Sequence, residues 1–117
     1  MSSIAISNPQ KEVQVNSSIE TVRKGIKNIP TVAKGAKLII ENDFMGFYQF
    51  EIVGNSIFSV GVFLELSIHR VSETMCEIKF ECRRKIGWID DGMEASECYK
   101  TITDCIRILT KLITDSQ

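Results

Sequence analysis

The chain has 117 residues, 44% of them hydrophobic, and its 14 basic and 15 acidic side chains leave a formal charge of -1. This length and apolar content suit one hydrophobic core, so we expect a single domain over residues 1–117. The charge balance argues against nucleic acid as a partner, and no apolar segment is long enough to cross a bilayer. Residues Met1 to Gln10 contain no leader pattern, so the expected location is cytoplasmic.

The N-terminal part of the chain predicts a strand followed by a helix. Polar and apolar residues alternate around Lys11–Asn16, as they do in a half-buried strand. Ser17 with Glu20 three residues later forms a capping box, so we expect a helix that begins near Ser18. Its apolar stripe is Ile19, Val22, Ile26 and Ile29.

Proline is expected to limit this first helix. Pro30 has no amide proton and clashes with the preceding turn, so the helix should end or kink at Ile29. Thr31–Lys34 has room for one more turn before Gly35 closes it.

From Lys37 the apolar period changes to two, which predicts a meander of four strands. Leu38 and Ile40 are expected on one face of the first of these strands, with a turn over Asn42–Gly46. Gly54-Asn55 is a hairpin signal, because both residues tolerate positive φ. The inward positions expected on the other strands are Tyr48, Phe50 and Ile52, then Phe58, Val60, Val62, Leu64, Leu66 and Ile68, then Cys76, Ile78, Phe80 and Cys82.

The longest helical period lies in Met93–Asp115. Asp91 followed by Glu94 is expected to cap its N-terminus. The stripe is broad enough for a helix that lies across a sheet. Its members are Ala95, Cys98, Ile102, Cys105, Leu109 and Leu112, widened by Tyr99, Ile106, Ile108 and Ile113.

The element order therefore predicts an α+β fold: a single curved antiparallel sheet in β-α-β-β-β-β-α order, with a long C-terminal helix packed across it. This order resembles the fold group of the TATA-binding protein repeat and the helix-grip domains of the START and pollen-allergen type. The resemblance rests on the strand Lys11–Asn16, the meander Lys37–Lys85 and the helix after Trp88. It implies a binding module in which sheet and helix hold a small apolar ligand.

Residues with catalytic or metal-binding chemistry are few. The four cysteines lack the close spacing of zinc sites and lie on apolar faces, so we expect buried reduced thiols, with a bridge between the last strand and the helix as the alternative. His69, the only histidine, is expected at the surface. Neither Asp90-Asp91 nor the basic groups around Arg23 and Arg83 form a recognisable site. The sequence predicts no metal, no cofactor and no catalytic residues.

Two functions from different classes remain open. The first is the ligand-binding module, whose predicted contacts are Tyr48, Phe50, Phe58, Phe80, Trp88 and Tyr99; the alternative is that these side chains simply fill the interior. The second is an interaction domain without a pocket, which forms a homodimer through an apolar patch on the outer sheet face. That patch would contain Ile39, Phe47, Ile57, Phe63 and Met75, within a rim of Glu65, Glu77 and Glu81.

Overall fold

The computed structural model describes residues 9–53, 61–84 and 92–116. It contains the predicted order of elements and confirms the predicted α+β class. The elements are β1 (Gln10–Val15), α1 (Ile19–Val32), β2 (Ala36–Asn42), β3 (Phe47–Ile52), β4 (Val62–Ser72), β5 (Met75–Arg84) and α2 (Gly92–Ser116).

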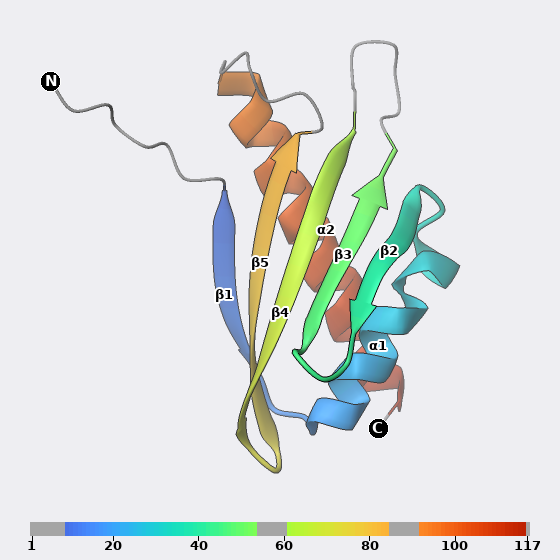
Figure 1. Cartoon of the computed structure of the whole chain (residues 1–117), viewed down its shortest axis with the longest axis vertical. Helices are drawn as coiled ribbons and strands as arrows, with labels where there is room; N and C mark the ends of the chain where they lie inside the picture. The colour runs from blue at the N-terminus through green and yellow to red at the C-terminus, as the bar shows by residue number, and fades with distance from the viewer. Residues whose placement is uncertain (1–8, 54–60, 85–91, 117) are drawn as a thin grey trace, which may run out of the picture.

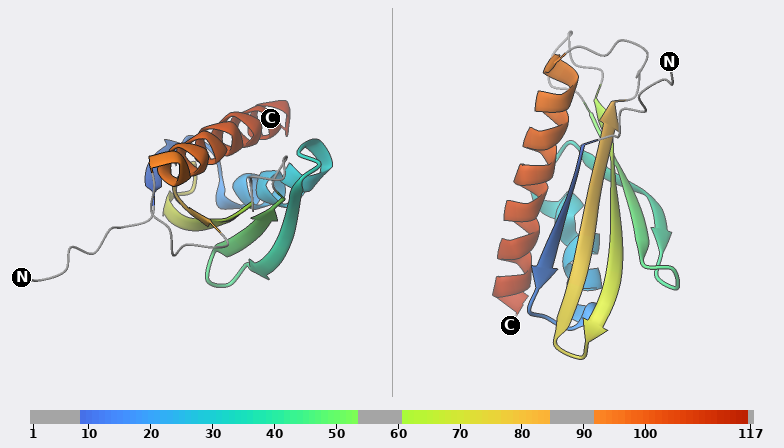
Figure 2. Two further views of the ribbon diagram at one scale, coloured as in Figure 1. Left: turned by 90° about the horizontal axis from the view of Figure 1, so that it is seen from above. Right: turned by 90° about the vertical axis from the view of Figure 1, so that its left-hand side faces the viewer.

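The five strands form one sheet in the order β1-β5-β4-β3-β2, and every neighbouring pair is antiparallel. Both helices lie on the same side of the sheet, behind it in the view of Figure 1. The sheet curves around them (Figure 2). α2 packs against β5, β4, β1 and α1, so it is the element that closes the core. Neither α1 nor α2 is both long and apolar enough to cross a membrane.

The core lies between the concave face of the sheet and the two helices. The alternating pattern of the strands turns large side chains inward, and α2 adds its buried stripe from the other side. The buried residues of the sheet include Tyr48, Phe50, Val62, Leu64, Leu66, Ile78 and Phe80, and those of α2 are Cys98, Ile102, Cys105, Leu109 and Ile113.

The two helices are in close contact at Gly25 of α1. A Cβ atom at this position would lie 3.0 Å from Leu109 Cδ1 and 3.3 Å from Ile113 Cγ1. Such distances are tighter than ordinary van der Waals contact, so the absence of a side chain lets α2 rest against α1. Gly25 therefore fixes the crossing of the two helices.

The start of α1 differs by one residue from the sequence prediction. The N-cap is Ser18, not Ser17, and its Oγ accepts a hydrogen bond from the Thr21 N–H at 3.3 Å. Ser17 is buried, and its carbonyl accepts a hydrogen bond from Cys76 Sγ at 3.4 Å. This tertiary contact ties Ser17 to β5, so the next serine, Ser18, caps the helix.

The helix continues past Pro30, so the alternative in which it ends at Ile29 was wrong, while Thr31 and Val32 belong to the further turn expected over Thr31–Lys34. α1 reaches Val32, and the N–H of Ala33 donates to the Ile29 carbonyl at 2.9 Å. The proline removes only its own donor, and the hydrogen bonds on either side carry the helix through one more turn.

A β-bulge in β2 changes the predicted faces of that strand. Leu38 pairs with Phe50, but Ile40 pairs with Gln49, and the register shifts between Leu38 and Ile40. Because directly opposed residues share a face, Ile40 lies on the outer side with Gln49 and not with Leu38. Ile39 and Ile40 are 42% and 43% exposed, as expected for outer positions.

Several predicted features fall outside the described residues. These are the Gly54-Asn55 hairpin, the inward positions Phe58 and Val60, and the caps and turn around Asp90-Asp91.

A polar cluster around Asp43 ties the β2–β3 turn to α1. Lys27 Nζ donates to Asp43 Oδ2 at 2.8 Å, Arg23 Nη2 donates to the Asp43 carbonyl at 2.7 Å, and the Tyr48 hydroxyl donates to Asp43 Oδ1. The hydrogen bond from Lys27 and then that from Tyr48 lower the pKa of Asp43 below its ordinary 3.8. The ionised carboxylate thus orients both the turn and the helix.

The first prediction concerns the contact between α2 and the core. Leu109 is 2% exposed, whereas Lys111, two residues later, is exposed. Leu109→Ala removes buried methyl groups and leaves a cavity, so it should lower the free energy of unfolding by about 2–5 kcal/mol. Lys111→Ala should change it far less in the same urea titration. Equal losses in the two variants would contradict the observed helix face.

The second prediction concerns the pH dependence of Asp43. A lowered folded-state pKa adds stability above the unfolded-state pKa, and this stability is lost as the pH falls through the folded value. Asp43→Asn should therefore unfold at a lower temperature than the native chain at neutral pH. The difference should shrink once the pH falls below about 4, the ordinary range of an aspartate. A difference that persists unchanged at low pH would mean that the ionised form is not what stabilises the turn.

Candidate functional site

An open cavity of about 460 Å³ lies between the sheet, the last turn of α1 and the first half of α2. β2 contributes its first residue, β3 its last ones and β4 its first ones, so the cavity sits at the end of the sheet where these three strands begin or finish. A volume of this size is within the range of small-molecule sites in proteins.

The walls of the cavity contain apolar side chains from both the sheet and the helices. Phe50 and Leu64, both buried, form the side that belongs to the sheet, and Ile108 and Cys105 form the side that belongs to α2. The remaining apolar lining residues are Ile29, Ala33, Ala36, Ile52, Val53 and Val62. A molecule bound here would bury apolar surface on several sides.

The cavity exists because the two helices diverge. They meet where Gly25 faces Leu109 and Ile113, and from there the N-terminal half of α2 leans away from α1 (Figure 1). α1 also ends at Val32. Beyond the end of α1, the concave face of β2, β3 and β4 faces α2 alone among the described elements. The cavity occupies the space between this face and α2.

The rim of the cavity carries charge. Lys34 follows α1, and Lys100 and Arg107 lie on α2 together with Glu97 and Asp104. Arg107 Nη2 is 3.7 Å from Asp104 Oδ1, so these two form an ion pair. Neither Lys34 nor Lys100 has an ion-pair partner among the described residues.

All four cysteines are free, and all four are buried, which confirms the predicted thiols. Cys105 is the one that lines the cavity within the described chain. Burial, and then the charge of Asp104, raise the pKa of Cys105 to about 12. Burial also raises the pKa values of Cys76 and Cys82. At neutral pH the thiol of Cys105 is therefore protonated, so it is a weak nucleophile.

The four predicted ligand contacts that the structure describes do not converge on one place. Phe50 lines the cavity. Tyr48 and Phe80 are fully buried in the core and are not among the lining residues, and Tyr99 is 52% exposed on α2. Phe58 and Trp88 lie outside the described residues.

Tyr48 is held in the core by its hydroxyl group. Burial, and then the hydrogen bond to Asp43, raise the pKa of Tyr48 to about 12. The hydroxyl stays protonated, and it donates its hydrogen bond to Asp43 in the turn between β2 and β3. In the described structure this side chain packs the interior and anchors a turn.

The sequence analysis missed most of the cavity, because it selected aromatic side chains. The lining residues of α2 are Glu97, Lys100, Thr101, Asp104, Cys105, Arg107 and Ile108. They recur at spacings of three and four, so they follow one edge of the helix. The sequence signal that could have located the cavity was the end of the first helix. A helix that stops near Gly35 leaves the far part of the sheet uncovered.

The outer face of the sheet does not bring the predicted dimer patch together. Phe47 is opposite Ser67, Phe63 is opposite Glu51, and the row between them consists of Gln49 and Glu65. Gln49 Nε2 donates to Glu65 Oε2 at 2.8 Å. A hydrogen-bonded polar pair thus separates the two phenylalanines.

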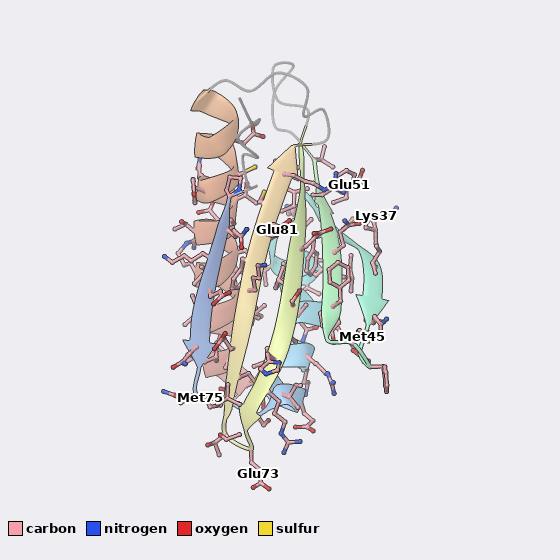
Figure 3. The ribbon with its side chains drawn as sticks, turned by 60° about the vertical axis from the view of Figure 1, so that its left-hand side comes forward. Lys37, Met45, Glu51, Glu73, Met75 and Glu81 are labelled. Carbon is pink, nitrogen blue, oxygen red and sulfur yellow. The ribbon has the colours of Figure 1, made fainter. Side chains whose placement is uncertain are left out.

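The surroundings of Phe63 and Met75, two residues of the predicted patch, are also polar. The Arg83 guanidinium lies over the Phe63 ring, 4.8 Å from its centroid. Figure 3 shows charged side chains on this side of the sheet: Lys37 and Glu51 on neighbouring strands, and Glu81 on β5. Met75 lies at the beginning of β5, next to the turn that carries Glu73 (Figure 3). Ile57 lies outside the described residues, and the homodimer stays a prediction.

His69 is exposed on β4 opposite Glu77 and does not line the cavity. Within residues 9–53, 61–84 and 92–116, no group of three or more histidine, cysteine, aspartate or glutamate side chains is arranged to hold a metal ion.

Comparison with known proteins identifies the fold. No protein-family model matches the chain, and no curated protein matches it by sequence. Among solved structures, a START superfamily protein from Mycobacterium smegmatis matches with a TM-score of 0.63 at 10% identity, over 95% of this chain and 99% of that one. Ara h 8.0201 matches with a TM-score of 0.53 at 7% identity, over 92% and 97% of the two chains.

A third structure, the di-domain ARO/CYC protein BexL from the BE-7585A biosynthetic pathway, matches with a TM-score of 0.66 at 9% identity. The match covers 93% of this chain and 46% of BexL. At such low identity these neighbours show the fold alone. They support the helix-grip part of the resemblance, while the TATA-binding part stays a prediction. The chain has a helix-grip fold.

Proposed function

We propose that this protein is a non-catalytic binding module that holds a small apolar ligand in the cavity between the sheet and α2. The observation that carries the proposal is the cavity of about 460 Å³, whose walls come from Phe50, Leu64, Ile108 and their apolar neighbours. Sites for small molecules are typically concave and mostly apolar, with a few polar groups at defined places. The helix-grip resemblance implies the same use of this architecture.

The lining residues favour binding over catalysis. Cys105 is protonated at neutral pH, because burial raises its pKa. The carboxylates of the described lining, Glu97 and Asp104, lie at the charged rim, and Asp104 is already paired with Arg107. Nucleophilic catalysis needs a nucleophile and a base within hydrogen-bond reach of each other. The described walls offer a place to bind without such a pair.

The third prediction tests the location of the ligand with two variants of neighbouring residues. Ala36 lies at the cavity and pairs with the inward-facing Ile52, whereas Lys37 pairs with Glu51 on the outer face. Ala36→Phe should fill part of the cavity, and Lys37→Phe adds the same ring on the opposite side of the sheet. The probe is phenylnaphthylamine, an uncharged apolar dye whose fluorescence rises on transfer out of water.

Ala36→Phe should weaken binding of the dye by about tenfold or more, because probe and side chain compete for the same space, while Lys37→Phe should leave the affinity unchanged. Thermal unfolding of both variants checks that they are folded. Native mass spectrometry of the freshly purified chain provides a second readout, since a co-purified apolar molecule should be lost from Ala36→Phe alone. Equal binding by the two folded variants would overturn the proposal.

A further inference from the structure

We infer that the cavity selects an amphipathic ligand with a single anionic group, and that Lys34 and Lys100 bind this group at the rim. This inference rests on the proposed function and specifies its ligand class: an apolar body of small-molecule size that ends in a carboxylate, sulfate or similar anion.

The first argument is the position of the two lysines. Lys34 follows the last turn of α1, and Lys100 lies on α2, so the two side chains border the cavity from different elements. Both are exposed, so the ammonium groups stay in water while their stems border the apolar lining. A ligand with its apolar end inside the cavity would present its polar end between them.

The second argument is the charge of the rim. Among the described residues it contains the cations Lys34, Lys100 and Arg107 and the carboxylates Glu97 and Asp104, a surplus of one positive charge. Arg107 is paired with Asp104 on its own helix. One anionic group on the ligand neutralises the surplus, whereas a cationic ligand would meet two unpaired ammonium groups.

The third argument is a contrast with lysines elsewhere in the molecule. Lys27 is paired with Asp43 and lies 3.8 Å from Glu41, and Lys79 lies 4.0 Å from Glu81. Lys24 and Lys111 are exposed like the rim lysines, but they do not line the cavity. Lys34 and Lys100 are the lysines of the described chain that are both at the cavity and without an ion-pair partner.

The experiment compares two dyes that differ in one charged group. Anilinonaphthalene sulfonate carries a sulfonate on the skeleton of phenylnaphthylamine, so the ratio of their dissociation constants reports recognition of the anion. The test protein is the full chain with Lys34→Gln and Lys100→Gln. The control is the full chain with Lys24→Gln and Lys111→Gln, which changes the net charge by the same amount away from the cavity.

The rim variant should bind the sulfonate dye about three- to tenfold more weakly than the native chain, the range expected for loss of two exposed ion pairs. Its affinity for the neutral dye should not change. The control variant should bind both dyes like the native chain. Added salt should reduce the preference of the native chain for the sulfonate dye, because exposed ion pairs are screened.

Two results would overturn the inference and leave the proposed function standing. The first is a native chain whose affinity for the neutral dye equals its affinity for the sulfonate dye. The second is an equal loss in the rim and control variants, which would indicate a general effect of net charge. If instead neither dye responds to Ala36→Phe, the proposed site itself fails. The two failures are therefore distinguishable.

Discussion

The close contact of α2 with α1 at Gly25 is the constraint on which the rest of the structure depends. Leu109 and Ile113 occupy the space that a side chain at position 25 would need. This contact sets where the two helices cross, and the buried stripe of α2 then falls on β5 and its neighbours. The helices touch near the C-terminal end of α2 and diverge toward its N-terminal half (Figure 1), and the cavity borders the concave face of the sheet at the end where they diverge.

The cavity and its charged rim follow from this geometry. α1 ends at Val32, and the chain turns back into β2 at Ala36, so the linker with Lys34 lies at the edge of the cavity. The edge of α2 that carries Lys100 and Asp104 borders the same space. An apolar interior with an ionic border is therefore a direct result of where one helix stops and how the other is inclined. Affinity for a ligand would come from the apolar walls, and discrimination between ligands from the border.

The Asp43 cluster at the surface and the buried cysteines stabilise the fold. Asp43 is held by Lys27, Tyr48 and Arg23, and this cluster joins the β2–β3 turn to α1. Cys82 of β5 and Cys98 and Cys105 of α2 are small buried side chains of the core, and Cys76 of β5 donates to the Ser17 carbonyl before α1. Groups that could have reactive chemistry in another setting are here desolvated or already hydrogen-bonded.

The sequence by itself determined the order of elements, the inward faces of β3, β4 and β5, and the stripe of α2, since these depend on local periods of two and 3.6 residues. It did not determine the cap of α1, which is Ser18 and not Ser17, because Ser17 is buried against Cys76. It also missed the bulge between Leu38 and Ile40, because an extra residue in one strand is defined only by its partner strand. The lining of the cavity was least predictable: Phe50 borders it, whereas Tyr48 and Phe80 are packed in the core and the rim residues were not foreseen, and the ligand contacts stay a prediction. Periodicity indicates which side chains face inward. Only the tertiary structure decides which of them meet another side chain and which border empty space, because that depends on the angle between two helices that are far apart in the sequence.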